Sequence, residues 1–258
     1  MPEIKNILDN FSTTSLEEMG EVKLMNRTDT KFIFNVEKLP AILNKATELY
    51  KVLEISNTRI LDYRTLYFDT PEFEMYNLHQ NGKLNRYKVR HREYLISNIS
   101  FLEVKFKSNK ERTIKKRIKQ KEIKEEFSDK SKAFILKNSP YKPNELVPKL
   151  YNKFSRITLV HKYDKERITI DLNLAYKTKE NNIDLPFLVI VEVKQEGFSN
   201  LSDFIKILRS QKIQATGMSK YCVGTVLMNK NIKYNRFKTK LLTLTKLSND
   251  AQFIRNYC

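Results

Sequence analysis

Charged and apolar residues alternate strictly between Arg86 and Arg117. Residues two apart in a β-strand lie on the same face, so this period predicts a three-stranded antiparallel ribbon with one charged face. The charged runs are Arg86-x-Lys88-x-Arg90-x-Arg92, Glu103-x-Lys105-x-Lys107 and Lys115-x-Arg117. The opposite face then carries Tyr87, Val89, Leu102, Val104, Phe106, Ile114 and Ile118.

The charged face has two possible explanations. One is an ordinary outer face of a sheet in contact with water, which is the common case for a basic strand. Like charges directly opposite each other on neighbouring strands destabilise the pairing, and two of them roughly 5 Å apart repel by about 3 kcal/mol at a dielectric near 20. Water relieves that repulsion on an open face, whereas in a concave site only an anion relieves it. The excess of like charge therefore favours a site for a polyanion.

The overall composition agrees with an anionic partner but does not identify one. The 258 residues include 48 Lys and Arg against 30 Asp and Glu, a net charge of +18. Such a balance favours nucleic acid, phosphate polymers, nucleotides or an anionic membrane surface. With 40% hydrophobic residues, 13 Tyr and 15 Phe, the chain has enough apolar side chains for a core and is not a disordered basic tail.

Cysteine usage and hydropathy predict a soluble, cytoplasmic protein. Cys222 and Cys258 form neither a disulfide framework nor a zinc motif, which favours a reducing compartment. No apolar run approaches eighteen residues, and the N-terminus has no basic segment followed by an apolar one. Contact with a membrane would come from the basic surface or from a membrane-protein partner, and the sequence leaves the oligomeric state open.

The remaining segments predict more strands with helices between them, without repeats or a long linker. Strands are expected at 23–35, 59–69, 154–162, 166–174 and 186–194, and helices at 36–50, 129–137 and 201–211. We therefore predict one α+β domain over 1–258. It would comprise an N-terminal helix in 1–22, an antiparallel sheet of about eight strands in 23–224, and a basic helical tail in 225–258.

Eight tilted antiparallel strands can close into a barrel whose interior and exterior positions alternate. If the charged faces point inward, cations would crowd the lumen, and phosphates would relieve their repulsion. A few carboxylates would hold Mg²⁺ or Mn²⁺ together with phosphate oxygens. The expected lumen cations are Lys31, Arg90, Arg92, Lys105, Lys107, Lys115, Arg156, Arg167 and Lys194, and the carboxylates are Asp29, Glu103, Asp171 and Glu192.

Backbone loops that cradle phosphate are absent from the sequence. With five glycines, the chain has neither GxxxxGK[ST] nor GxGxxG, so side chains must hold any phosphate. The histidines, His79, His91 and His161, occur singly, and structural or surface roles are favoured for them.

Several short segments, in a common order over residues 27 to 224, together resemble a known family. They are RTDTKFIF, LYFDT, NRYKVRHREY, FLEVKFK, KKR, SRITL, ERITIDLNL, VEVK and SKYCVG. The chain resembles the VTC (vacuolar transporter chaperone) polyphosphate polymerase domain, within the triphosphate tunnel superfamily that also contains the CYTH triphosphatases. This resemblance implies a closed antiparallel β tunnel that binds a triphosphate and a divalent metal. It also implies transfer of the terminal phosphoryl of ATP onto polyphosphate.

The resemblance and the charged faces together suggest a role for each residue of the motifs. The expected partners are ATP or another triphosphate and polyphosphate, with Mn²⁺ or Mg²⁺ and without nucleic acid. Catalytic roles are expected for Lys31, Arg90, Arg92, Lys105, Arg156 and Lys220. Substrate binding is expected for Arg86, Lys107, Lys115, Arg167, Lys194 and Ser219, and metal binding for Glu192, Glu103 and Asp171.

Two departures from the family pattern bear on the activity. The ExExK signature of the triphosphatases is Arg27-x-Asp29-x-Lys31 here, with a base in place of the first acid, and this disfavours plain hydrolysis. A basic residue often found two before the Ser-Lys pair is Gly217 here. A polyphosphate polymerase is therefore the first hypothesis, with a metal-dependent triphosphatase and a non-catalytic polyphosphate- or nucleotide-binding module as alternatives. Glu192→Ala is expected to remove metal-dependent turnover while sparing the fold.

Overall fold

The computed structural model describes residues 2–21, 27–110, 112–197, 202–250 and 253. The chain divides into two compact units, each described here by itself. Unit 1 comprises Met1–Asp62, Phe154–Leu174 and Leu185–Met218, and unit 2 comprises Tyr63–Lys153, Ala175–Asp184 and Ser219–Cys258. Residues 22–26, which include the predicted boundary between N-terminal helix and sheet, lie outside the described residues. That the chain forms one domain stays a prediction.

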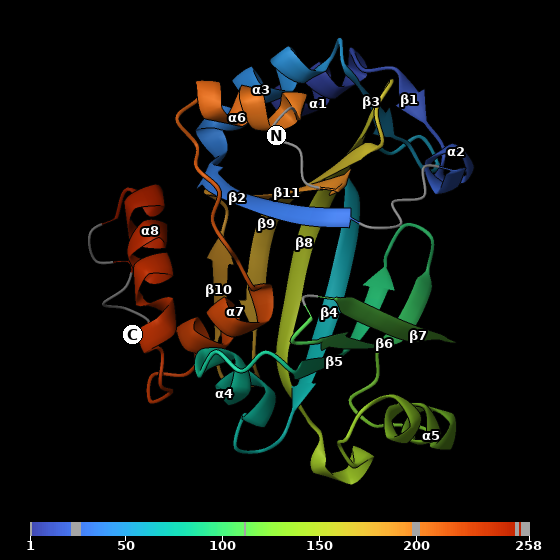
Figure 1. The fold of residues 1–258 in the computed structure, drawn as a ribbon, viewed down its shortest axis with the longest axis vertical. Helices are drawn as coiled ribbons and strands as arrows, with labels where there is room; N and C mark the ends of the chain where they lie inside the picture. Colours follow the sequence, from blue (N-terminus) through green and yellow to red (C-terminus); the bar gives the residue numbers. More distant parts are fainter. Residues whose placement is uncertain (1, 22–26, 111, 198–201, 251–252, 254–258) are drawn as a thin grey trace. The chain divides into compact units, whose positions relative to one another are not determined.

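Unit 1 combines antiparallel strands with short helices (Figure 1). Its hydrogen-bonded strand order is β2-β11-β9-β8, with β3 paired antiparallel to β8 and β1 paired parallel to β3. Its helices are α1 (Pro2–Asp9), α2 (Leu16–Glu21), η1 (Val36–Lys38), α3 (Leu39–Ala46) and α6 (Asp203–Ser210). Its strands are β1 (Thr13–Thr14), β2 (Arg27–Asn35), β3 (Tyr50–Leu53), β11 (Leu188–Glu196) and parts of β8 (Val147–His161) and β9 (Glu166–Lys177).

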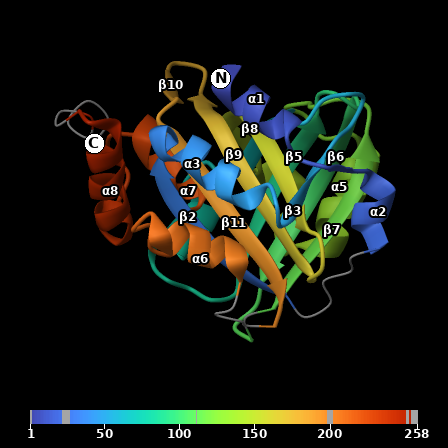
Figure 2. The ribbon, with the colours of Figure 1, turned by 90° about the horizontal axis from the view of Figure 1, so that it is seen from above.

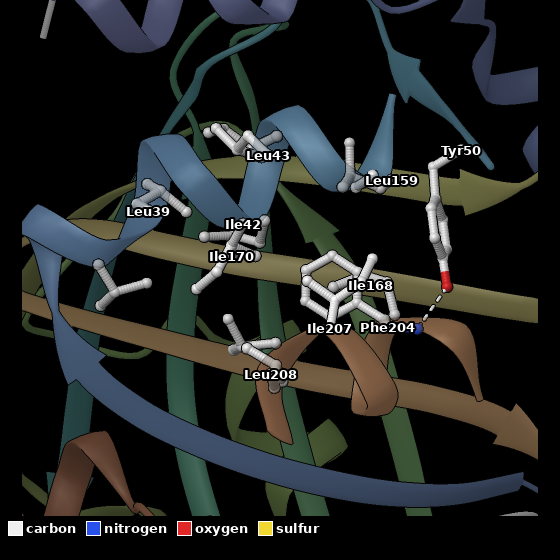
Figure 3. Close-up of a cluster of buried hydrophobic side chains, with 14 of the residues drawn as sticks. Leu39, Ile42, Leu43, Tyr50, Leu159, Ile168, Ile170, Phe204, Ile207 and Leu208 are labelled. Carbon is white, nitrogen blue, oxygen red and sulfur yellow. Dashed lines mark hydrogen bonds between the residues drawn. The ribbon is translucent and has the colours of Figure 1, made fainter. Parts of the chain in front are cut away.

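The strands of unit 1 have one apolar and one charged face, as the alternation predicts. Ile168 and Ile170 of β9 and Val191 of β11 are fully buried, and the helices α1, α3 and α6 gather over this side (Figure 2). Figure 3 shows Ile42 of α3 and Phe204 of α6 packed with Ile168 and Ile170. The positions between these apolar residues therefore carry their side chains to the other face.

Unit 2 contains the predicted charged ribbon. Its strand order is β9-β8-β4-β5-β6-β7, and β4 to β7 pair antiparallel. The strands that unit 2 adds are β5 (Arg86–Tyr94), β6 (Ile99–Lys107), β7 (Thr113–Gln120) and most of β4 (Leu61–Asp69) and β10 (Asn182–Leu185). Its helices are α4 (Glu74–Gln80), α5 (Asp129–Asn138), η2 (Pro143–Glu145), α7 (Lys220–Met228), η3 (Asn235–Phe237) and α8 (Lys238–Ser248).

The apolar face of the ribbon packs against α5. Val89, Leu102 and Val104 are buried in one cluster with Ile135 of α5. The rings of Tyr87 and Phe106 stack with their centroids 4.6 Å apart, which fits the packing role predicted for them. Ile114 differs, because 51% of its surface is exposed on β7.

The helix α7 is buried along almost its whole length in unit 2, and Gly224 makes this possible. A Cβ at position 224 would lie 2.4 Å from Tyr176 Cε1 and 2.7 Å from Leu150 Cδ2.

Since real Cβ atoms do not approach so closely, Gly224→Ala is expected to destabilise the protein by about 3 kcal/mol, the upper end of the usual cost of overpacking. Thermal unfolding checks this. Gly20→Ala is the control, because nothing lies within 4 Å of a Cβ at Gly20, and an equal loss in both variants would contradict the packing assignment.

The α+β class and the large antiparallel sheet are confirmed, whereas the closed tunnel is not. The strand order of the described residues runs from β2 to β7 without a ladder that joins these two ends. Closure therefore stays a prediction. None of the helices in the described part of the chain is long and apolar enough to cross a membrane.

Several predicted boundaries are corrected. The segment 1–22 contains strand β1 between α1 and α2, and the predicted helix 36–50 ends at Ala46 because Tyr50 begins β3. The predicted boundary at residue 225 falls inside α7, whose residues Tyr221 to Met228 are buried. The later helix α8 carries the buried residues Leu241 and Leu244.

Candidate phosphate-binding site

The charged face of the ribbon in unit 2 brings like charges side by side. The register places Lys88 opposite Lys105, and Lys105 opposite Lys115. The next row places Glu103 between Arg90 and Arg117. Neighbouring strands lie about 4.8 Å apart, so three ammonium groups start from adjacent backbones. An extended anion bound along this row would remove the repulsion within it.

Glu103 is the acidic side chain within this cationic face. Only 1% of its surface is exposed, and its carboxylate accepts from Arg90 Nε at 2.8 Å and from Lys115 Nζ at 3.0 Å. Burial would raise the pKa of Glu103, but the charges of Arg90, Arg92 and Lys115 outweigh it and lower the pKa to about 2. Glu103 therefore stays ionised and offsets part of the cationic charge.

The start of α7 brings two further predicted site residues, Ser219 and Lys220, into unit 2. Ser219 is the N-cap of α7, and its hydroxyl accepts from Cys222 N at 3.2 Å and from Lys88 Nζ at 2.9 Å. This places the Ser219–Lys220 pair beside the row of lysines. Lys88 was not assigned a site role from the sequence, although its place between Arg86 and Arg90 in the alternation was a usable signal.

The charged face of unit 1 centres on Glu192. Its carboxylate lies 2.6 Å from Lys31 Nζ and also pairs with Lys194, whose ammonium donates to Thr169 at 3.1 Å. Burial raises the pKa of Glu192, but Lys194 and Lys31 outweigh this and hold it well below the usual value. Burial lowers the pKa of Lys194 to about 8, although Glu192 opposes the shift.

Arg156 and Asp171 form a second pair in unit 1. Arg156 Nη2 lies 2.9 Å from Asp171 Oδ2, and Nε bonds the other carboxylate oxygen, so the contact is bidentate. Only 3% of the surface of Asp171 is exposed. Arg167 lies directly opposite Lys194 across β9 and β11. A nearby cavity of about 310 Å³ is lined by Asp29, Thr30, Lys31, Ala215, Thr216 and Gly217.

The predicted metal ligands are hard oxygen donors that are already paired with cations. Both oxygens of Glu103, Glu192 and Asp171 contact a basic side chain. A carboxylate oxygen keeps a second lone pair, and oxygen is what Mg²⁺ and Mn²⁺ prefer, so these residues fit such an ion chemically. Glu192 and Asp171 lie in unit 1 and Glu103 lies in unit 2.

Among the described residues, a different group has ligand atoms close enough together to hold a metal ion, within 4.8 Å of one another. It comprises His161, Asp164 and Asp203 of unit 1. His161 Nδ1 accepts from the backbone N–H of Asp164 at 2.9 Å, which assigns the ring proton to Nε2. Nε2 lies 3.4 Å from Asp203 Oδ2. A protonated ring nitrogen does not bind a metal, so this group is better explained as a hydrogen-bonded histidine.

The structure thus distributes the predicted site residues over two clusters. Both lie on the face opposite the apolar cores, where Arg92, Glu103, Asp171 and Lys194 are nearly buried, whereas Lys105 and Lys115 are exposed. Unit 1 holds Lys31, Arg156, Arg167, Lys194, Asp171 and Glu192. Unit 2 holds Arg86, Arg90, Arg92, Lys105, Lys107, Lys115, Glu103, Ser219 and Lys220. Their roles in binding and catalysis stay predictions.

The sequence model of the VTC domain matches residues 26–229, which is most of the chain. The protein therefore belongs to the VTC domain family, as its motifs indicated. The comparison with curated proteins gives no match.

Similar solved structures include three with low identity. A candidate adenylate cyclase from Vibrio parahaemolyticus is 12% identical with a TM-score of 0.45, covering 77% of this chain and 99% of its own. A candidate adenylate cyclase from Bacillus halodurans is 14% identical with a TM-score of 0.45, covering 76% and 96%. HpAC1 from Hippeastrum, for which a dominant triphosphatase activity is described, is 11% identical with a TM-score of 0.48, covering 78% and 95%. At these TM-scores the similarities decide neither fold nor activity here.

Proposed function

We propose that the protein is a polyphosphate polymerase that moves the terminal phosphoryl group of ATP onto a polyphosphate chain. The observation that carries this proposal is the row of Lys88, Lys105 and Lys115 beside the buried Glu103. Membership of the VTC domain family supports the same substrate class. We further propose that the strands close into a tunnel around the phosphates, and that the protein acts in the cytoplasm.

In this mechanism the protein contributes alignment and charge. Phosphoryl transfer through a loose transition state needs its equatorial oxygens neutralised and its attacking and leaving oxygens in line. Arg90, Arg92 and Lys105 would bind phosphate oxygens in unit 2, and Lys31 and Arg156 in unit 1. A general base is unnecessary, because the attacking oxygen of a polyphosphate end is already ionised.

Glu192 is the chief proposed ligand for a divalent ion, and the other carboxylates proposed to bind one are Asp171 in unit 1 and Glu103 in unit 2. When bound, Mn²⁺ or Mg²⁺ would neutralise charge on the phosphates. The carboxylate oxygens of Glu192, which contact Lys31 and Lys194, would be the atoms that hold the ion.

The activity is tested by incubating the pure protein with ATP and Mn²⁺ and separating long-chain polyphosphate from orthophosphate. The proposal expects polymer. Orthophosphate alone would replace the polymerase with a metal-dependent triphosphatase. Tight binding of ATP or polyphosphate without any product would indicate a binding module.

Two adjacent lysines give a matched test of which face binds phosphate. Lys115 contacts Glu103 on the charged face, whereas Lys116 is paired with the buried Val104 and therefore starts on the opposite face of the ribbon. Lys115→Ala is expected to weaken tripolyphosphate binding about tenfold, since it removes a charge-assisted hydrogen bond. Lys116→Ala removes the same charge and is expected to leave the affinity within about twofold, because Lys116 lies on the other face of the strand from Lys88, Lys105 and Lys115. Titration calorimetry measures both, and equal losses would show that net charge alone matters.

A further inference from the structure

Tyr67 of β4 lies within the cation cluster of unit 2. The register places it directly opposite Arg90, and only 4% of its surface is exposed. Its side chain makes a hydrogen bond with Arg90, whose guanidinium donates to the phenolic oxygen. Its ring stacks on that of Tyr221 in α7, with the centroids 5.1 Å apart. Tyr67 therefore contacts two separate elements that each carry a proposed phosphate ligand.

The charged groups around Tyr67 act on its ionisation. Burial raises the pKa of Tyr67, but the charges of Arg90, Arg92, Lys88 and Lys220 outweigh burial and lower it. Tyr67 in turn raises the pKa of Tyr176 of β9, and the ring of Tyr221 also lies against that of Tyr67. The phenol is thus an acidified hydroxyl among cations, and not a core tyrosine whose pKa is raised by burial, as it is for Tyr176.

Tyr221, the residue after Lys220, is fixed from a second direction. Its hydroxyl donates to Asp69 Oδ2. Asp69 is fully buried and also accepts from Met75 N at 2.8 Å and Tyr76 N at 3.0 Å, at the start of α4. The start of α7 is therefore anchored to β4 through the Tyr67 ring and the Asp69 carboxylate.

We propose that Tyr67 is a positioning residue that aligns Arg90 of β5 and Lys220 of α7 on the same condensed phosphate. Its hydroxyl orients the guanidinium, and its ring supports the residue that follows Lys220. A bound phosphate chain would span these two cations and the Lys88–Ser219 contact. This inference rests on the proposed phosphate substrate and adds a tyrosine to the lysines and arginines proposed from the sequence.

Removing only the hydroxyl separates positioning from packing. Tyr67→Phe keeps the ring on Tyr221 and loses the bond from Arg90. We expect tripolyphosphate to bind Tyr67→Phe about fivefold more weakly in calorimetric titrations, the usual effect of one hydrogen bond. Tyr87→Phe is the matched control, because Tyr87 stacks on Phe106 on the apolar face of the ribbon, and its affinity is expected to be unchanged.

A second readout follows the phenol itself through the absorbance of tyrosinate. In the unmodified protein, one tyrosine is expected to ionise below the rest, and Tyr67→Phe is expected to lack this step. Tripolyphosphate should move the step to higher pH, because the anion offsets the cations that favour the phenolate. This readout uses the unmodified protein, so it tests the inference even if Tyr67→Phe does not fold.

The outcomes separate this inference from the proposed function. Weaker binding by Tyr67→Phe together with a ligand-induced shift of the step supports it. If the unmodified protein binds tripolyphosphate but the step does not move, and Tyr67→Phe binds equally well, the inference is overturned and the function stands. If the unmodified protein binds no tripolyphosphate, the proposed function is overturned, and the inference with it.

Discussion

Glu103→Gln is expected to lower the free energy of unfolding by about 3 kcal/mol, as expected for breaking a buried ion pair by removing one partner. For a chain of this size the midpoint of thermal unfolding then falls by about 10 °C. The physical reason is that Arg90 and Lys115 lose a carboxylate that is 1% exposed, while the neighbouring cations remain. Tripolyphosphate should restore much of the loss, because it supplies the missing negative charge. Differential scanning calorimetry with and without the anion measures both effects.

The exposed pair of Glu122 and Lys124 provides the control for Glu103. The two side chains are 63% and 65% exposed at a separation of 3.4 Å. Glu122→Gln is therefore expected to change the stability by less than about 0.5 kcal/mol, with or without tripolyphosphate. If tripolyphosphate stabilises Glu103→Gln no more than this control, the charged face does not bind the anion.

The contribution of Glu103 should also depend on pH. The pKa of Glu103 in the folded protein is about 2, below the ordinary value of 4.5. Its contribution to the free energy of unfolding is therefore complete when the pH is above about 4.5. The contribution is lost as the pH falls from about 4.5 towards about 2. The stability difference between the unmodified protein and Glu103→Gln should therefore shrink as the pH falls through this window. A difference that stays constant down to about pH 3 would contradict the assigned charge state.

Glu192→Ala is the second change with a large expected effect, and the structure modifies what the sequence suggested. The sequence alone predicted lost turnover with an intact fold. However, Glu192 pairs with Lys194, which is only 8% exposed, so its removal leaves a buried ammonium without that partner. We expect a loss of about 3 kcal/mol in stability and of at least about 100-fold in metal-dependent turnover.

A double variant separates these two losses. Replacing Glu192 with Leu and Lys194 with Met removes both charges, which is often neutral for stability when a buried pair is exchanged for apolar residues. The double variant is expected to regain most of the unfolding free energy but no turnover. If turnover returned with stability, Glu192 would be a structural residue and not a metal ligand. Thermal unfolding and the ATP assay with Mn²⁺ provide the two readouts.

The ribbon and its two faces could be predicted from the sequence, because a period of two directly encodes a strand that has one charged side. The pairing of Glu103 with Arg90 and Lys115 also follows from that pattern once the register is known. The register itself comes from the turns and from packing, and the residue spacing does not contain it.

Other features depend on contacts between distant segments and had no local signal. The sequence of Lys220–Met228 is a short apolar stretch without a feature that distinguishes it from other buried helices. Its burial depends on the close approach of Gly224 to Tyr176. Tyr67 lies in an alternating strand where its side chain looks like a core residue. Only the fold shows that its neighbours are cations. The division of β8 and β9 between two units likewise leaves no mark in their hydrophobic period.

Lysine acylation read by mass spectrometry tests most directly whether the row of lysines on the ribbon binds condensed phosphate. The protein would be modified with and without tripolyphosphate at matched ionic strength. We expect Lys88, Lys105 and Lys115 to be protected by tripolyphosphate, while Lys116, which starts on the other face of the same strand, reacts equally in both. Equal reactivity of Lys115 and Lys116 under both conditions, without protection of Lys88 or Lys105, would contradict the claim.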